Sequence, residues 1–231
     1  MAKGEADMAI PRQLAFTLGH GESFAREDLL EGASNAAALA LIERWPDWPS
    51  RIVALIGPEG AGKSHLAAIW AATAGARTIA GHTLDEASVP TALATGALVV
   101  EDLAVGIFDE RALFHLLNMA RAEKADVLIT ARTPPVVWKA GLPDLASRLR
   151  EMPVVTLDPP GDALLRAVLV KLFADRQLAV DESLVGYLVS RMERSFAVAG
   201  SMVAALDREA LRQQRPVTRA LASELFRDPV I

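Results

Sequence analysis

Cysteine is absent from this chain of 231 residues, which excludes disulfide bonds and thiolate metal sites. The four histidines are scattered and show no metal-ligand spacing. Aromatic residues make up only 5% of the chain, and acidic residues outnumber basic ones by 29 to 24, for a net charge of −5. Because such a chain lacks general attraction to a phosphate backbone, we expect no direct sequence-specific DNA binding.

Long apolar segments are also missing from the sequence. No stretch reaches about 18 consecutive apolar residues without a charge or a chain breaker, and residues 1–10 lack the apolar region of a signal peptide. We therefore expect a cytoplasmic protein with no membrane partner. In contrast, 52% of the side chains are hydrophobic, so the chain can bury a substantial core.

One segment combines a strand, a glycine-rich turn and a helix. The apolar run 51–56 predicts a buried parallel strand, and residues 65–74 predict a helix. Between them lies a complete G-x-x-x-x-G-K-S motif, which consists of Gly57, Pro58, Glu59, Gly60, Ala61, Gly62, Lys63 and Ser64. In this motif backbone N–H groups surround phosphates, the lysine reaches the β- and γ-phosphates, and the serine binds Mg²⁺. The alternative is a glycine turn that binds no nucleotide.

Two other apolar runs end in polar residues that suit the same chemistry. The run 97–100 is followed by Glu101 and Asp102, where P-loop proteins place carboxylates that order Mg²⁺ and water. The run 127–130 ends at Thr130, which could sense a γ-phosphate or position water. Without the phosphate-binding motif these residues would read as ordinary strand ends, so their interpretation depends on that motif.

The order of apolar and helical patterns predicts the fold class. Apolar runs at 77–80, 97–100, 127–130 and 154–157 alternate with helical patterns such as 110–123. This alternation predicts an α/β fold with a parallel sheet flanked by helices. A helix is also expected within 31–45, entered at Ser34 or Asn35 and ended by Pro46.

After Pro159-Pro160-Gly161 only helical patterns follow, at 162–177, 182–194, 199–212 and 218–226. We therefore expect three parts: an extended tail at 1–22, a nucleotide-binding α/β domain at 23–160 and a small all-helical domain at 161–231.

Several segments taken together resemble the DnaA/Hda-type AAA+ ATPases, and the shorter Hda-type regulators more than DnaA. They occur in family order at 31–36, 62–66, 114–118, 128–135, 145–149 and 215–218. The resemblance implies an AAA+ P-loop domain followed by an all-helical lid domain. It also implies bound ADP or ATP with Mg²⁺, and which nucleotide is resident stays open.

The resemblance further assigns roles to individual residues. It implies an adenine pocket around Leu29 and Leu30, nucleotide contacts from the P-loop through His65, and catalytic positions at Asp102 and Thr130. Ser64 and Glu101 would bind the metal. Arg148 occupies the arginine-finger position, from which a guanidinium acts on nucleotide held by a neighbouring subunit. The alternative for Arg148 is a surface ion pair with Asp144 or Glu151.

Three departures from the DnaA pattern affect the expected function. Glu101 stands where the family has aspartate, and Gly200 stands where a sensor 2 arginine is expected, with Arg194 and Arg208 off register. We therefore expect weak intrinsic ATP hydrolysis. The sequence ends at Ile231 without room for a helix-turn-helix domain, which points to an Hda-like regulator rather than an initiator.

The N-terminal tail contains a short motif that resembles the peptide by which Hda docks on the DNA sliding clamp. Its residues are Gln13, Leu14, Phe16 and Leu18. Two or three apolar anchors and a directional glutamine suit a preformed pocket on a partner. The period of two equally suits an edge strand or packing on the core.

The leading hypothesis is a negative regulator of replication initiation, which binds adenine nucleotide and the sliding clamp and promotes hydrolysis of DnaA-bound ATP through Arg148. The alternative is an AAA+ DNA-remodelling or helicase-loading ATPase with its own ATP turnover. Whether the chain forms a homo-oligomer stays open.

Overall fold

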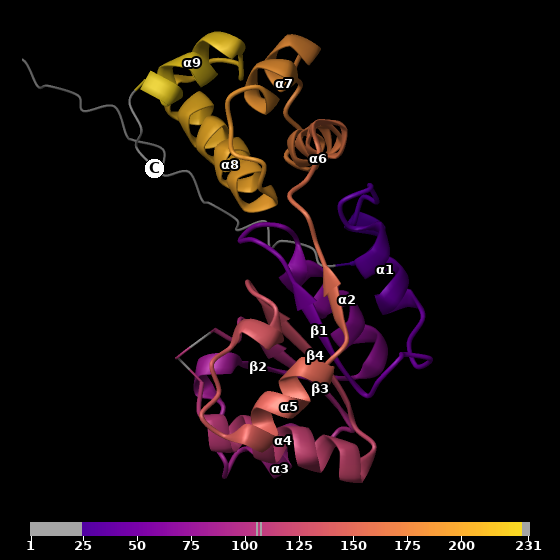
Figure 1. The fold of residues 1–231 in the computed structure, drawn as a ribbon. Coiled ribbons are helices and arrows are strands. Elements are labelled where there is room, and N and C mark those ends of the chain that lie inside the picture. The colour runs from indigo at the N-terminus through magenta and orange to yellow at the C-terminus, as the bar shows by residue number, and fades with distance from the viewer. Residues whose placement is uncertain (1–24, 105, 107, 228–231) are drawn as a thin grey trace, which may run out of the picture.

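The computed structural model describes residues 25–104, 106 and 108–227, which form a parallel β-sheet covered by helices and a C-terminal group of helices (Figure 1). The predicted clamp-binding peptide, with Gln13, Leu14, Phe16 and Leu18, lies outside these residues. Three 3₁₀ helices also occur among the described residues, η1 (Arg26–Asp28), η2 (Gly81–Thr83) and η3 (Pro135–Val137).

Within the part of the chain that the structure describes, the sheet has five strands: β1 (Ile52–Ile56), β2 (Arg77–Ala80), β3 (Ala97–Glu101), β4 (Asp126–Ala131) and β5 (Val154–Thr156). Their order is β2-β3-β4-β1-β5, and every neighbouring pair is parallel, which confirms the predicted fold class. β1 and β4 are buried at every position, so they appear in the sequence as continuous apolar runs. Because the strands are parallel, the carboxyl ends of β1, β3 and β4 meet at one edge of the sheet.

One face of the sheet is covered by α1 (Ala36–Glu43) and α2 (Lys63–Ala74), which pack on alternate strand residues such as Val53 and Leu55. α1 ends three residues before the predicted stop at Pro46. Trp45 and Trp48 lie beyond the end of α1, and their rings contact Trp70, with centroids 6.4 and 4.8 Å from its ring. The Trp45 indole N–H also donates to Asp126 Oδ2 at 2.9 Å, which anchors this turn under the sheet.

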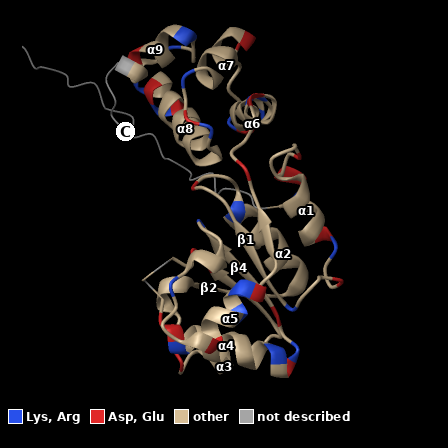
Figure 2. Cartoon of the chain, in the orientation of Figure 1, with Lys and Arg blue, Asp and Glu red and all other residues tan. Residues whose placement is uncertain are grey.

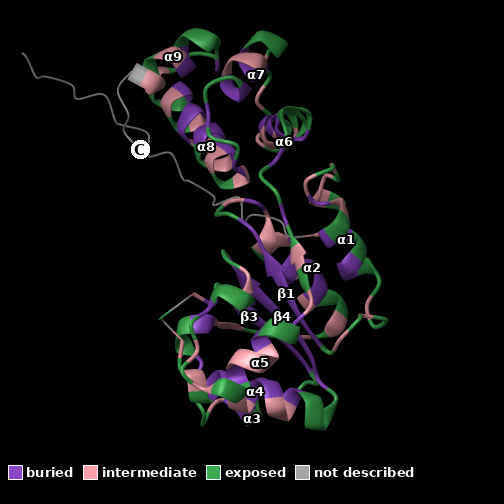
Figure 3. Ribbon diagram, in the orientation of Figure 1, coloured by how far each residue is buried: buried purple, intermediate pink, exposed green. Residues whose placement is uncertain are grey.

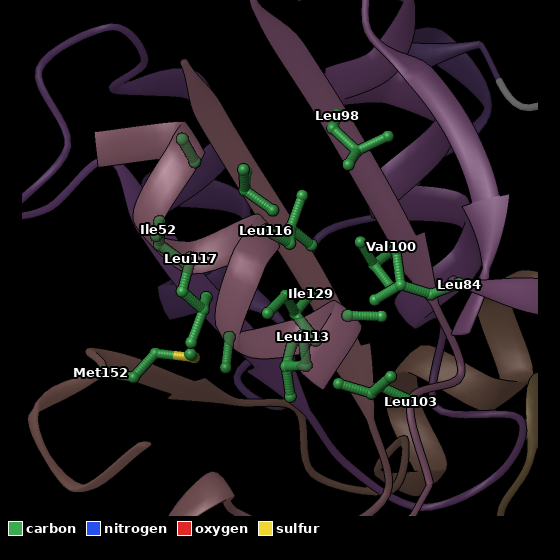
Figure 4. Packing of buried hydrophobic residues seen from close by; sticks show 14 of the residues in the cluster. Ile52, Leu84, Leu98, Val100, Leu103, Leu113, Leu116, Leu117, Ile129 and Met152 are labelled. Atoms are coloured by element: carbon green, nitrogen blue, oxygen red, sulfur yellow. The ribbon is translucent and has the colours of Figure 1, made fainter. Parts of the chain in front are cut away.

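The opposite face is covered by α3 (Val89–Ala92), α4 (Glu110–Glu123) and α5 (Pro143–Glu151). Figure 4 shows Leu113, Leu116 and Leu117 of α4 among the buried residues of this cluster. α4 has its predicted bounds, and Asp109 Oδ1 caps it by accepting from Arg111 N at 2.8 Å. α5 was not predicted from the sequence.

The C-terminal helices are α6 (Asp162–Asp175), α7 (Glu182–Val189), α8 (Phe196–Gln213) and α9 (Arg219–Arg227), which form the lid. They bury their own hydrophobic cluster, and Figure 3 shows buried segments facing inward among them. α7 ends before the predicted Arg194, and α8 begins before the predicted Ala199. Ser195 causes the earlier start, because its hydroxyl accepts from Val198 N at 3.3 Å as an N-cap.

The surface charges of both parts are mixed. In the view of Figure 2, acidic and basic residues are interspersed along the sheet domain and the lid. Within residues 25–104, 106 and 108–227, no helix has the length and apolar character needed to cross a membrane.

Candidate nucleotide-binding site

The turn between β1 and α2 has the backbone of a phosphate cradle. Gly60 and Gly62 adopt φ values of 70° and 98°, which side chains other than glycine rarely accept. A Cβ at Gly57 would lie 2.5 Å from the carbonyl oxygen of Leu157, because β5 ends directly beneath the turn. α2 then begins at Lys63, so its unpaired N–H groups and positive dipole end face the turn.

The Lys63 ammonium folds back over this turn. Its Nζ donates to the carbonyl oxygens of Gly57 at 2.9 Å and Pro58 at 2.8 Å. Burial is the largest influence on the pKa of Lys63 and lowers it, while Asp102 raises it, Arg132 lowers it and Glu59 raises it. A phosphate at this position would compensate the ammonium for its lost contact with water, because the phosphate oxygens carry negative charge and accept hydrogen bonds.

The carboxyl end of β3 carries Glu101 and Asp102. Ala97 and Val99 pack on the α2 side of the sheet, so strand alternation directs Glu101 to that side too, where Ser64 lies in the first turn of α2. Asp102 has φ 52°, and its N–H donates to Thr130 Oγ1 at 2.9 Å. Thr130 is 2% exposed, and its hydrogen bond from Asp102 N–H fixes the backbone turn on which Asp102 lies.

Arg132 is a member of this site that the sequence prediction missed. It follows β4 directly, and its Nη2 lies 2.8 Å from Glu59 Oε2 of the P-loop. Its Nε lies 3.9 Å from Asp102 Oδ1. The sequence did offer an indication: Arg132 follows an apolar run closely, and the carboxyl end of a parallel strand lies at the same sheet edge as the P-loop.

The lid contacts the P-loop directly. Phe196 N donates to Gly60 O at 2.8 Å, and a Cβ at Gly62 would touch the Phe196 ring at 3.4 Å. Beside this contact lies a pocket of about 460 Å³, lined on the core side by Pro58 and Glu59 and on the lid side by residues that include Asp162 and Arg194. This pocket adjoins the phosphate cradle.

The predicted adenine-pocket stretch lies against the lid. Leu29 packs on the hydrophobic cluster of α1 and α2, and Leu30 O accepts from Asn35 Nδ2 at 2.9 Å. Lys171 of α6 forms an ion pair with Asp28 at 2.7 Å, which joins the segment to the lid. His65 Nε2 lies 3.3 Å from Ala25 O, at the same segment.

Gly200, at the expected sensor 2 position, lies inside α8, where an added Cβ would meet nothing within 4 Å. Arg194, just before α8, is paired with Asp162 at 2.9 Å. Arg208, the other off-register arginine, lies within α8 as well.

Arg148 lies elsewhere, on α5. Its Cζ sits 5.5 Å from the centroid of the Phe114 ring of α4, a cation–π distance. Among the described residues, no ion pair joins Arg148 to Asp144 or Glu151, and no hydrogen bond or ion pair joins it to the P-loop. The ion-pair interpretation is therefore wrong for this structure.

The residues present fit a nucleoside phosphate with Mg²⁺. The glycine backbone leaves space that a Cβ would fill, and among the described residues no acidic side chain forms an ion pair with the partly buried Lys63 ammonium. No group of three or more His, Asp or Glu side chains that could bind a metal occurs in the described part of the chain. Such a group is not required here, because Mg²⁺ takes one or two protein ligands and completes its shell with phosphates and water.

Comparisons with known proteins identify the fold. No protein-family model matches the sequence. The structure is similar to domain III of the replication initiation protein DnaA from Thermotoga maritima, with TM-score 0.70 and 16% identity over 89% of this chain and 96% of that chain. AMPPCP-bound DnaA from Aquifex aeolicus gives TM-score 0.64 and 16% identity, over 83% and 68%.

The RuvB Holliday junction branch migration motor from Thermotoga maritima gives TM-score 0.67 and 16% identity, over 85% of this chain and 69% of that chain. DnaA and RuvB are AAA+ ATPases, and the parallel sheet with its C-terminal helices matches them. The chain therefore has the AAA+ fold.

Proposed function

We propose that this chain binds adenine nucleotide and acts as an Hda-like negative regulator of DNA replication initiation, promoting hydrolysis of ATP bound to DnaA. The observation that carries the proposal is the placement of Arg148. It is held over the Phe114 ring, and in the described residues no carboxylate neutralises it and no contact joins it to its own P-loop. A cation positioned in this way is suited to a nucleotide on a neighbouring molecule.

The nucleotide would bind between the P-loop and the lid. Residues 57–63 and His65 would bind phosphates and ribose, Leu29 and Leu30 would approach the base, and Ser64 with Glu101 would hold Mg²⁺. When bound, Mg²⁺ neutralises charge on the β- and γ-phosphates. AMPPCP bound to the similar DnaA of Aquifex aeolicus supports adenine as the base.

In this proposal the tail residues Gln13, Leu14, Phe16 and Leu18 dock on the sliding clamp. The bound nucleotide keeps the core and lid in the arrangement that can bind DnaA. Arg148 then enters the active site of ATP-bound DnaA. The guanidinium stabilises charge that develops on the γ-phosphate of DnaA, so the covalent chemistry occurs on the partner.

The test combines purified protein, DNA-loaded sliding clamp and ATP-bound DnaA, and measures hydrolysis of the DnaA-bound ATP. We expect Arg148→Ala to lower the stimulated rate about a thousandfold, the lower range for an arginine finger. Arg150→Ala is the matched control, because Arg150 is an exposed arginine in the same last turn of α5. Full stimulation by Arg148→Ala, or none by the wild type, contradicts the mechanism.

Clamp docking is tested separately by the double variant Gln13→Ala, Phe16→Ala. We expect it to lose binding to purified clamp while its circular dichroism and nucleotide affinity stay at the wild-type level. Retained clamp binding would remove the tail from the proposal and leave the role of Arg148 standing.

A second candidate function is an AAA+ DNA-remodelling or helicase-loading ATPase with its own turnover. The observation that favours it is the network at its own P-loop, where Thr130 fixes Asp102 beside Arg132 and Lys63. This candidate predicts ATP hydrolysis by the chain alone, stimulated by single-stranded DNA and abolished in Asp102→Asn. The regulator predicts little turnover under either condition.

A further inference from the structure

Arg132 forms the centre of a charged cluster at the mouth of the phosphate cradle. Its guanidinium contacts Glu59 at 2.8 Å and lies 3.9 Å from Asp102. The side chains of Arg132, Glu59 and Asp102 are 57%, 73% and 66% exposed. Ion pairs this exposed contribute little stability, so the cluster is not a structural anchor and can exchange partners.

The position of the cluster indicates which phosphate it faces. Asp102 occupies the carboxylate position beyond β3, and Lys63, whose pKa responds to Arg132, Asp102 and Glu59, is the residue that reaches the β- and γ-phosphates. The two cations and two carboxylates balance each other in charge. A triphosphate adds negative charge that favours the two cations and repels Glu59.

We infer that Arg132 binds the γ-phosphate of a nucleoside triphosphate held at this chain's own P-loop, and thereby sets its preference for triphosphate over diphosphate. With a diphosphate, Glu59 retains Arg132. With a triphosphate, the planar guanidinium exchanges the exposed carboxylate of Glu59 for phosphate oxygens, which accept bidentate hydrogen bonds from arginine. The inference rests on the proposed nucleotide binding and deepens it.

Arg194 is a second arginine beside the phosphate cradle, and it provides the control. It lines the pocket between the lid and Glu59, but both its Nε and its Nη2 already contact Asp162 Oδ1 at 2.9 Å. Arg194 is therefore paired within the lid, whereas Arg132 contacts Glu59 of the P-loop and lies near Asp102, which follows β3.

The experiment measures dissociation constants of ADP and of AMPPCP, each with Mg²⁺, for the full chain and for Arg132→Ala, Glu59→Gln and Arg194→Ala. Arg132→Ala is expected to weaken AMPPCP binding about tenfold, the effect of one hydrogen bond to a charged group, and to leave ADP within about twofold. Glu59→Gln is expected to strengthen AMPPCP binding a few-fold, because it releases Arg132. Arg194→Ala is expected to leave the ratio of the two constants unchanged.

Equal loss of ADP and AMPPCP in Arg132→Ala, or an equal change of the ratio in Arg194→Ala, would overturn the assignment. If Arg132→Ala unfolds, Arg132→Lys and Glu59→Gln decide, since a purely structural ion pair predicts weaker binding of both nucleotides in both variants. Failure of the proposed nucleotide binding is distinguishable, because the wild type would then bind neither nucleotide. Failure of the proposed regulation alone would leave both dissociation constants of the wild type measurable.

Discussion

Arg132 and Arg148 both lie beyond β4, yet their surroundings differ in a way that separates two kinds of site. Arg132 lies between two carboxylates of its own P-loop edge, Glu59 and Asp102. Arg148 rests on an aromatic ring, which holds the guanidinium in place without neutralising its charge. The difference matches the two proposals, in which Arg132 serves nucleotide bound by this chain and Arg148 serves nucleotide bound by a neighbouring molecule.

Among changes at the P-loop edge, the largest expected effect comes from removing the lysine side chain. Lys63→Ala removes the ammonium from Gly57 and Pro58, and with it the charged donor to the phosphates. We expect affinity for ADP to fall about tenfold to a hundredfold, corresponding to about 1.5–3 kcal/mol. Titration with a fluorescent ADP analogue measures it, with the exposed Lys139→Ala as the control. Unchanged affinity would mean that the turn does not bind phosphate.

A second change tests how firmly the P-loop edge is joined to the lid. Gly60 has φ 70°, and an added Cβ would lie 1.9 Å from Ser195 Oγ. Gly60→Ala should therefore lower the free energy of unfolding by about 1–3 kcal/mol, measured by urea denaturation.

Gly200→Ala is the opposite control for that experiment. This glycine lies within α8 with open space around it, so alanine should stabilise the protein by about 0.5–1 kcal/mol. If both variants shift the free energy of unfolding in the same direction, the space and backbone conformation at the two glycines do not decide the effect.

The smallest expected effect comes from changing the contact between Phe114 of α4 and Arg148 of α5. Phe114→Leu keeps an apolar side chain but removes the ring beneath Arg148. A cation–π contact that is partly open to solvent contributes about 0.5–1 kcal/mol, so stimulation of partner ATP hydrolysis should fall about twofold to fivefold. The affinity of the chain for its own ADP should stay constant. A fall in that affinity would show that the two regions are coupled.

The strands and α4 could be predicted because their signals are local. β1 and β4 are buried on both faces, so they need continuous apolar runs, and Glu110–Glu123 carries helical periodicity behind an aspartate cap. α5 has a weaker signal: it is short, begins at Pro143, and buries only Leu145 and Leu149. A helix that depends on so few buried residues is decided by the surface on which it packs.

The end of α1 also could not be predicted from the local sequence. Its sequence favours a helix up to Pro46, but Trp45 and Trp48 gain more by packing on Trp70 and bonding at Asp126 and Leu41 O than by extending the helix. Tertiary packing overrides local propensity at such ends.

By itself, the sequence determined the phosphate cradle, since Gly57 to Ser64 depends on residues adjacent in the chain between a strand and a helix. It also placed polar residues at the carboxyl ends of β3 and β4. Only the tertiary structure decided that Arg132 meets Glu59 and Asp102, because parallel pairing brings three distant strand ends together. It likewise decided that the ring of Phe114 holds Arg148, since that contact joins two helices packed side by side on one face of the sheet.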